Sequence, residues 1–139
     1  MAYDRFDPNQ LSVVFGVSPI SGFAEDTMIT IENDNPKYNY NNDIHGNVTR
    51  YRVNKNTAKI TLILTQDSKS NNILSNYVEL DRINDAGVFP VMLKDPSGST
   101  IFSCEYASIQ SEPKIEFGQD AKNREWVIHA SNITQYIGS

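Results

Sequence analysis

A side-chain period of two runs through most of this chain and constrains its fold more than any other feature. Apolar and polar residues alternate in five segments, each rich in β-branched and aromatic residues. These segments are residues 10–18, 27–33, 58–66, 100–110 and 125–134. Alternation of this kind is typical of antiparallel strands that have one buried and one exposed face. The sequence therefore predicts a mainly β domain, and its 139 residues fit a single domain, 1–139.

The apolar members of these strands form the predicted core. They are Leu11, Val13, Phe15 and Val17; Ile29 and Ile31; Ile60, Leu62 and Leu64; Phe102, Cys104 and Tyr106; and Trp126, Ile128 and Ala130. Residues 89–94 and 100–110 are expected to pair as a hairpin across the turn Asp95-Pro96-Ser97-Gly98. Cys104 alternates with two aromatic residues, so we expect a small core side chain there and not a nucleophile.

One segment changes the period. Between Ser70 and Asp85 apolar residues recur every three or four positions, which predicts one amphipathic helix of about four turns. Ser68 or Ser70 can supply its N-cap oxygen, and Gly87 is placed for a left-handed C-cap. The apolar stripe expected to pack on the sheet consists of Ile73, Leu74, Tyr77, Val78 and Leu80.

The segment 32–56 is polar, with eight asparagines, yet its tyrosines and valines keep a strand-like alternation around the plausible tip His45-Gly46-Asn47. A hairpin of this composition cannot fold back on a core, so we expect it to project and to be ordered by a partner. The expected inter-subunit contact residues are Tyr38, Tyr40, His45, Arg50, Tyr51 and Arg52. The two arginines could pair with Glu25 or Asp26 of a neighbour.

Several classes of function lack their usual signals. Twelve basic against seventeen acidic residues give a net charge of −5, which argues against a domain built to grip phosphate backbone. His45 and His129 stand apart, and no glycine-rich phosphate loop occurs, so we expect no enzyme, metal or cofactor. No apolar run is long enough for a membrane span, and the first residues lack a signal-peptide layout.

The chain resembles the tail tube proteins of contractile-tailed bacteriophages. Residues 6–16 and 20–29 resemble the first strand, the Ser-Gly-Phe-Ala turn and the following strand of that family. Gly46-Asn47-Val48-Thr49-Arg50 resembles the family's Gly-x-Val-Thr-Arg return strand. Residues 58–66 and 68–75 resemble its next strand and its helix entry.

This resemblance implies an antiparallel β-sandwich or barrel protomer with a flanking helix, similar to pyocin and type VI secretion tube proteins. It also implies hexameric rings that stack into a hollow tube, inside a contractile sheath, through which DNA passes without specific binding. The implied partners are further copies of the chain, the tail sheath protein, the tape-measure protein, a baseplate or tube initiator, and a tail terminator. The implied location is the virion tail, assembled in the host cytoplasm.

A tube of this kind has an inner wall that DNA must pass. The expected lumen residues are Thr30, Glu32, Lys59, Thr61 and Thr65, opposite the apolar sets of their strands. We expect this wall to be polar and not net basic, because each phosphate contact would slow the passage of DNA.

Two alternatives remain open. One is a tube initiator or other baseplate protein of the same fold. The other is a carbohydrate-binding β-sandwich, which would need exposed aromatic rings; its candidates are Trp126, Tyr106, Tyr136 and Tyr51.

Overall fold

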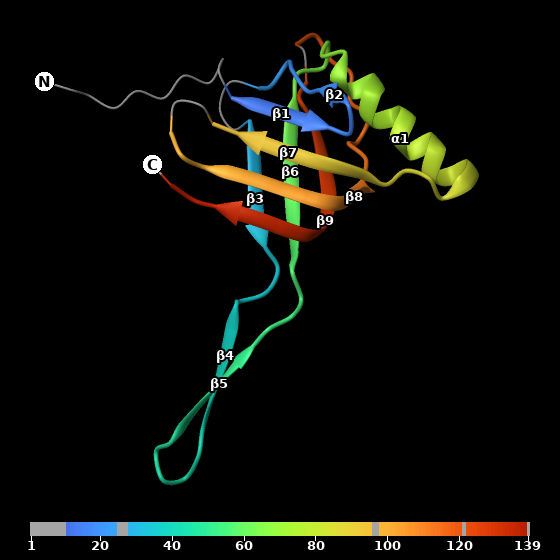
Figure 1. Cartoon of the computed structure of the whole chain (residues 1–139). Helices are drawn as coiled ribbons and strands as arrows, with labels where there is room; N and C mark the ends of the chain where they lie inside the picture. Colours follow the sequence, from blue (N-terminus) through green and yellow to red (C-terminus); the bar gives the residue numbers. More distant parts are fainter. Residues whose placement is uncertain (1–10, 25–27, 96–97, 121, 139) are drawn as a thin grey trace, which may run out of the picture.

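A computed structural model of the chain describes residues 11–24, 28–95, 98–120 and 122–138. In these residues seven antiparallel strands form one sheet in the order β2-β1-β7-β8-β9-β6-β3, one helix flanks it, and two further strands form a separate ribbon (Figure 1). The elements are β1 (Ser12–Phe15), β2 (Ser18–Pro19), β3 (Ile29–Asn33), β4 (Tyr38–Asn42), β5 (Val48–Arg52), β6 (Thr57–Leu64), α1 (Ser70–Asn84), β7 (Phe89–Lys94), β8 (Ile101–Ser111) and β9 (Arg124–Tyr136). The predicted mainly β fold with one helix is confirmed.

The body is a single open sheet that folds over on itself. Figure 1 shows β3 and β6 running across the direction of β1, β7 and β8. The long strands β8 and β9 connect the two halves, and their pairing register shifts between Ile109 and Ser111. In β9, Asn132 has a left-handed backbone with φ 55°. Bulges and left-handed residues bend strands, so these positions let one sheet enclose a core.

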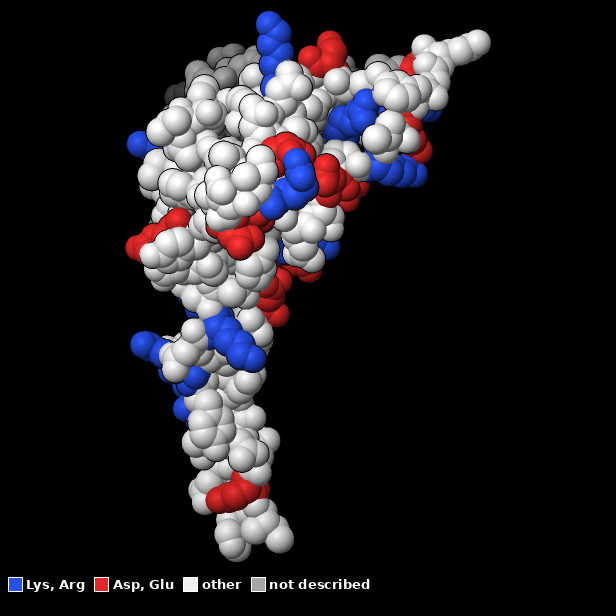
Figure 2. All heavy atoms as spheres, turned by 90° about the vertical axis from the view of Figure 1, so that its right-hand side faces the viewer, with Lys and Arg blue, Asp and Glu red and all other residues white. Residues whose placement is uncertain are grey.

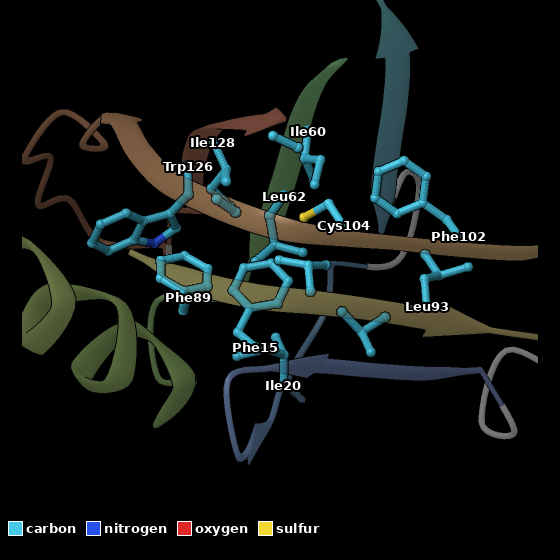
Figure 3. Packing of buried hydrophobic residues seen from close by; sticks show 14 of the residues in the cluster. Phe15, Ile20, Ile60, Leu62, Phe89, Leu93, Phe102, Cys104, Trp126 and Ile128 are labelled. Atoms are coloured by element: carbon cyan, nitrogen blue, oxygen red, sulfur yellow. The ribbon is translucent and has the colours of Figure 1, made fainter. Parts of the chain in front are cut away.

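The core fills the inside of this fold (Figure 3). Ile60, Leu62 and Leu64 of β6 are fully buried, as the alternation predicts. Phe15 stacks on Phe89 with 5.4 Å between ring centroids. The remaining members of the buried cluster are Val13, Ile20, Ala58, Leu74, Val91, Leu93, Phe102, Cys104, Ala107, Trp126, Ile128, Ala130 and Ile133.

The prediction of burial is wrong for two residues of the expected core. Val17 is 94% exposed because β1 ends at Phe15 and Gly16, with φ +66°, turns the chain into β2. Tyr106 is 56% exposed because the register between β7 and β8 shifts, so that Ala107 takes the buried place after Cys104. Both errors arise where strict alternation is interrupted by a turn or a bulge.

The predicted helix is present as α1. Leu74 is fully buried, and Ile73, Tyr77 and Val78 are half-buried against the core. The Tyr77 ring stacks on Phe89 with 4.3 Å between centroids, and its hydroxyl donates a hydrogen bond to the carbonyl of Phe15. Leu80, expected in the stripe, is 43% exposed instead.

The N-terminal cap differs from the expected one. The N-cap position is Lys69, which makes no side-chain cap. Ser70 Oγ instead accepts a hydrogen bond from the Ser21 N–H at 2.9 Å. Ser68 Oγ, one of the two expected oxygens, accepts the Ser70 N–H at 3.3 Å and donates to the Ser21 carbonyl at 2.6 Å. The two serines therefore fasten the start of the helix to the loop after β2.

The C-terminal cap is also different. Asp85 has the left-handed backbone, with φ 53°, and its N–H donates to the Asp81 carbonyl at 3.0 Å. Gly87 has another reason to be glycine, because a Cβ there would lie 2.5 Å from the Tyr77 carbonyl oxygen. The glycine allows the chain to pass close to the helix on its way to β7.

The hairpin of β4 and β5 projects from the body, as predicted (Figure 1). It continues the pair of β3 and β6, with which it is joined by residues 34–37 and 53–56. At this junction the Asp34 N–H donates to the Thr57 carbonyl and the Val53 N–H donates to the Lys37 carbonyl. Nearly all of the hairpin's side chains are exposed or half-buried, so it adds little to the core.

Leu74→Ala should lower the free energy of unfolding by about 2–5 kcal/mol, because it removes a fully buried side chain and leaves a cavity. Leu80→Ala is the matched control on the same helix and should cost much less, since Leu80 is exposed. Urea unfolding of the two variants checks this. Equal midpoints for Leu74→Ala and the unsubstituted chain would show that α1 does not pack as described.

Candidate assembly surfaces

The hairpin presents two different faces. Tyr38 pairs with Arg52 and Tyr40 with Arg50, so these four side chains share one face. The Arg50 guanidinium lies 3.5 Å from the centroid of the Tyr38 ring. Tyr51 pairs with Asn39 and points to the opposite face, so the structure separates it from the other expected contact residues.

The aromatic face is also the cationic one. A hydrogen bond from Arg52 and the charge of Arg50 lower the pKa of the Tyr38 hydroxyl. Residues 34–56 hold four of the twelve basic residues and two of the seventeen acidic ones, which leaves eight basic against fifteen acidic residues elsewhere. Figure 2 shows lysines and arginines gathered where the hairpin leaves the body, and acidic side chains on the body above them. Outside residues 34–56, the part of the chain that the structure describes holds seven basic and eleven acidic residues, so the hairpin and the described body are opposite in sign.

The hairpin tip is a fixed turn. Asp43 Oδ1 accepts hydrogen bonds from the N–H groups of His45 at 2.9 Å and Asn47 at 2.8 Å, and Oδ2 accepts one from Asn47 Nδ2. These bonds lower the pKa of Asp43. Gly46 has φ +84°, which completes the turn. The turn holds His45 outside the ribbon and leaves Ile44 95% exposed.

Asp43 and Ile44 were not among the contact residues that the sequence suggested. An aspartate followed by His-Gly-Asn is a signal for a turn in which the carboxylate bonds the backbone ahead of it. That signal could have identified Asp43 as the residue that shapes the tip.

The outward face of the sheet near β3 brings most of the expected lumen residues together. Thr30 pairs with Thr61 and Glu32 with Lys59, and none of these four side chains is in the core. Thr65 does not belong to this face, because β6 ends at Leu64 and the Thr65 N–H and hydroxyl both donate to the Gly22 carbonyl.

Strand β9 extends this face with residues that the sequence analysis did not include. His129 pairs with Lys59, and Val127 pairs with Thr61. His129 is exposed and Val127 is half-buried. The face is therefore mixed in character, with Glu32 directly opposite Lys59.

Cys104 lies in the core, and burial raises the pKa of its thiol, so it is a poor nucleophile. Within the described residues no group of three histidine, cysteine or acidic side chains lies close enough to hold a metal ion. The same residues contain no helix with the length and apolar character needed to cross a membrane.

Trp126 is also buried, at 3% exposure, with its indole N–H donating to Asn71 Oδ1 at 2.9 Å. Trp126 therefore belongs to the core, as the strand alternation predicts, and it offers no exposed ring to the carbohydrate-binding alternative. Tyr51, Tyr106 and Tyr136 are exposed, but they lie on three different strands, and Tyr51 is on the hairpin. Glu25 and Asp26, the suggested partners of the hairpin arginines, lie outside the described residues, as do Pro96 and Ser97 of the turn before β8.

The tip should lose its order in acid. Because hydrogen bonding lowers the pKa of Asp43, the carboxylate stabilises the turn above the ordinary aspartate pKa of about 4, and this contribution is lost as the pH falls through the lowered value. The amide chemical shifts of His45 and Asn47, measured by NMR across this range, check the effect, because a local turn sets the shift of an amide even where that amide exchanges quickly. Asp43→Ala should move both shifts to random-coil values at neutral pH, and Asn41→Ala, on the same ribbon, should not. Unchanged shifts in Asp43→Ala would contradict the described turn.

No protein-family model matches the sequence. The fold is that of three solved structures from contractile injection systems. The tube-terminating cap of the anti-feeding prophage matches with a TM-score of 0.66 at 13% identity, over 98% of this chain and 93% of that chain. A chain of the PVC sheath–tube complex in its extended state matches with a TM-score of 0.63 at 14% identity, over 95% and 91% of the two chains.

A chain of the PVC sheath and tube terminator in its extended state matches with a TM-score of 0.65 at 14% identity, over 99% of this chain and all of that chain. A closer relationship appears in sequence. Structural protein ORF10 of Pseudomonas phage KPP10 is 31% identical over 140 residues, which cover 93% of this chain and 79% of the relative. The chain therefore belongs to the family of this phage structural protein.

Proposed function

We propose that this phage structural protein is a tail tube protein, which polymerises as stacked hexameric rings to form the hollow inner tube of a contractile tail. The observation that supports this most directly is the projecting hairpin of β4 and β5. Its Tyr38, Tyr40, Arg50 and Arg52 face is opposite in charge to the rest of the chain. A second copy of the same chain is therefore a natural partner for it.

The hairpin has the character of a binding arm. A two-stranded ribbon alone in water is marginally stable, so a long one is stabilised when another surface covers it. Tyrosine and arginine offer large contact areas and are enriched at protein interfaces. In the proposed tube, this face lies on the acidic body of a subunit in the neighbouring ring.

The proposed inner wall includes the outward face of β3, β6 and β9. Thr30, Glu32, Lys59 and Thr61 share this face by strand register. Glu32 opposes Lys59, so their charges offset each other and DNA phosphates meet no net basic strip there. Thr65 does not belong to this wall, because it lies beyond the end of β6.

The proposed partners follow from the proposed role. They are copies of the chain, the tail sheath protein around the tube, the tape-measure protein, a baseplate or tube initiator at one end and a terminator at the other. DNA passes through without specific binding. The protein would be found in the virion tail after assembly in the host cytoplasm.

A second candidate is a tube terminator or cap. The observation in its favour is that two of the solved structures of the same fold are a tube-terminating cap and a sheath and tube terminator. A terminator forms one ring that closes a tube, whereas a tube protein stacks upon itself. The products of self-assembly therefore separate the two functions.

Electron microscopy of the purified chain tests the proposal. We expect stacked hollow tubes from the complete chain and none from a variant that lacks residues 35–54. The deletion leaves Lys55 and Asn56 as a two-residue connection between Asp34 and Thr57, which are already joined by a backbone hydrogen bond of 3.2 Å. Two-residue connections suit antiparallel strands, so the body should still fold.

The outcomes separate the functions. Circular dichroism and a cooperative thermal transition verify the fold of the deletion variant. Single rings from the complete chain would favour the terminator, and a monomer at every concentration would contradict both functions. Tubes from the folded deletion variant would show that the hairpin is not the arm that stacks the rings.

The inner wall of the assembled tube should carry no net positive electrostatic potential, as calculated from coordinates built into a density map. Each retained phosphate contact adds salt-dependent affinity, which would slow the passage of DNA. We expect Thr30, Glu32, Lys59 and Thr61 to face the channel. A map that places these four outside the channel, or that shows a strongly basic wall, would contradict this part of the proposal.

A further inference from the structure

A hollow of about 590 Å³ lies where the hairpin joins the body. Its wall comes from both arms of the junction and from the end of β9. We call it the socket and define it by six of its lining residues, Asn35, Lys37, Arg52, Val53, Lys55 and Ile133. Ile133 is buried and Val53 is half-buried, so two apolar side chains lie among the asparagine, threonine and glutamine residues that supply most of the lining.

The wall of the socket carries three cations. Lys37, Arg52 and Lys55 line it, and none of them has an acidic partner within 4.0 Å among the residues that the structure describes. Asp34 lies close by in sequence but does not line the hollow, and its Oδ2 accepts the hydroxyl of Thr57. The socket therefore fits an occupant with a small apolar tip and a negative charge.

The hairpin tip of the same chain has both features. Ile44 is 95% exposed at its end, and the ionised Asp43 stands beside it. Because the Asp43 hydrogen bonds fix the turn, the tip loses little conformational freedom on binding. Its carboxylate is acceptor-rich, so it can still attract the lysines of a socket.

We propose that the socket of one copy receives the hairpin tip of a second copy. A chain cannot fill its own socket, because about ten extended residues, roughly 30 Å, separate the junction from the tip. If a second copy is displaced by this distance along the direction of the hairpin, the tip of the second copy reaches the socket of the first. The cationic face of the second copy's hairpin then lies along the acidic body of the first copy. Such a contact is head-to-tail and repeats without closing, as a stacked assembly requires. The proposal rests on the proposed tube function and names the contact that joins successive rings.

Disulfide trapping tests this contact while Asp43 and Ile44 of the tip and the three cations of the socket stay in place. His45→Cys places a thiol on the tip, and Asn54→Cys places one on the lining of the socket. The two variants are mixed, assembled and oxidised, and disulfide-linked dimers are quantified. Cys104 is 5% exposed and stays unreactive.

The control mixes His45→Cys with Val17→Cys, whose position is 94% exposed but lies at the turn between β1 and β2. We expect at least about tenfold more dimer from the tip and socket pair, because the contact raises the local concentration of one thiol near the other. Adding Lys37→Glu and Lys55→Glu to the Asn54→Cys chain should remove most of this excess.

The outcomes also separate this contact from the proposed function. Tubes in the micrographs with dimer yields no higher than the Val17→Cys control would overturn the socket and leave the tube function standing. Tip-to-tip dimers from His45→Cys alone, in excess of the mixed pair, would overturn it as well. Absence of both tubes and cross-links would overturn both proposals.

Discussion

The pairing of β3 with β6 is the interaction on which the rest of this structure depends. Inside the body it places Ile29 and Ile31 beside Leu62 and Ile60, and β6 supplies four core side chains that are fully buried. The same two chain segments then leave the body as the arms of the hairpin. A ribbon too polar to fold alone is thereby held in one direction by the most buried strand of the domain.

The division between body and hairpin is also a division of charge. The body concentrates the acidic residues, and the hairpin combines arginine with tyrosine on one face. Surface charges contribute little to folding, so this distribution is not explained by the stability of a single subunit. It is explained if copies meet with hairpin against body, since electrostatic complementarity sets the register of an interface. The proposed tube is the assembly that uses this arrangement repeatedly.

Most of the fold followed from local periodicity. Strict alternation identifies the buried face of β6, and that of β9 as far as Ala130; beyond the left-handed Asn132 it fails, because Ile133 is buried. The change to a helical period identifies α1 within one residue of its observed end. The failures have a common physical cause. Val17 and Tyr106 lie at a turn and a bulge, where one extra or missing residue changes the face of every later side chain.

The site was less accessible to sequence reasoning than the fold. The expected capping residues differ from the observed ones because tertiary contacts decide them: Ser70 Oγ accepts the Ser21 N–H and does not cap its own helix. The pairs of tyrosine and arginine, and the separation of Tyr51 from them, depend on a register that the sequence alone leaves open. The socket requires residues from β9 and from the hairpin junction, which are about eighty positions apart, so no local pattern could reveal it.

The central claim is that the hairpin belongs energetically to the assembly and not to the subunit. Hydrogen exchange followed residue by residue, on the dispersed subunit and on the assembled material, measures this directly. The account predicts fast exchange over residues 33–56 of the free subunit, with protection in β6 to β9, and slow exchange over 33–56 after assembly. Slow exchange of 33–56 in the free subunit, equal to that of β6, would contradict it.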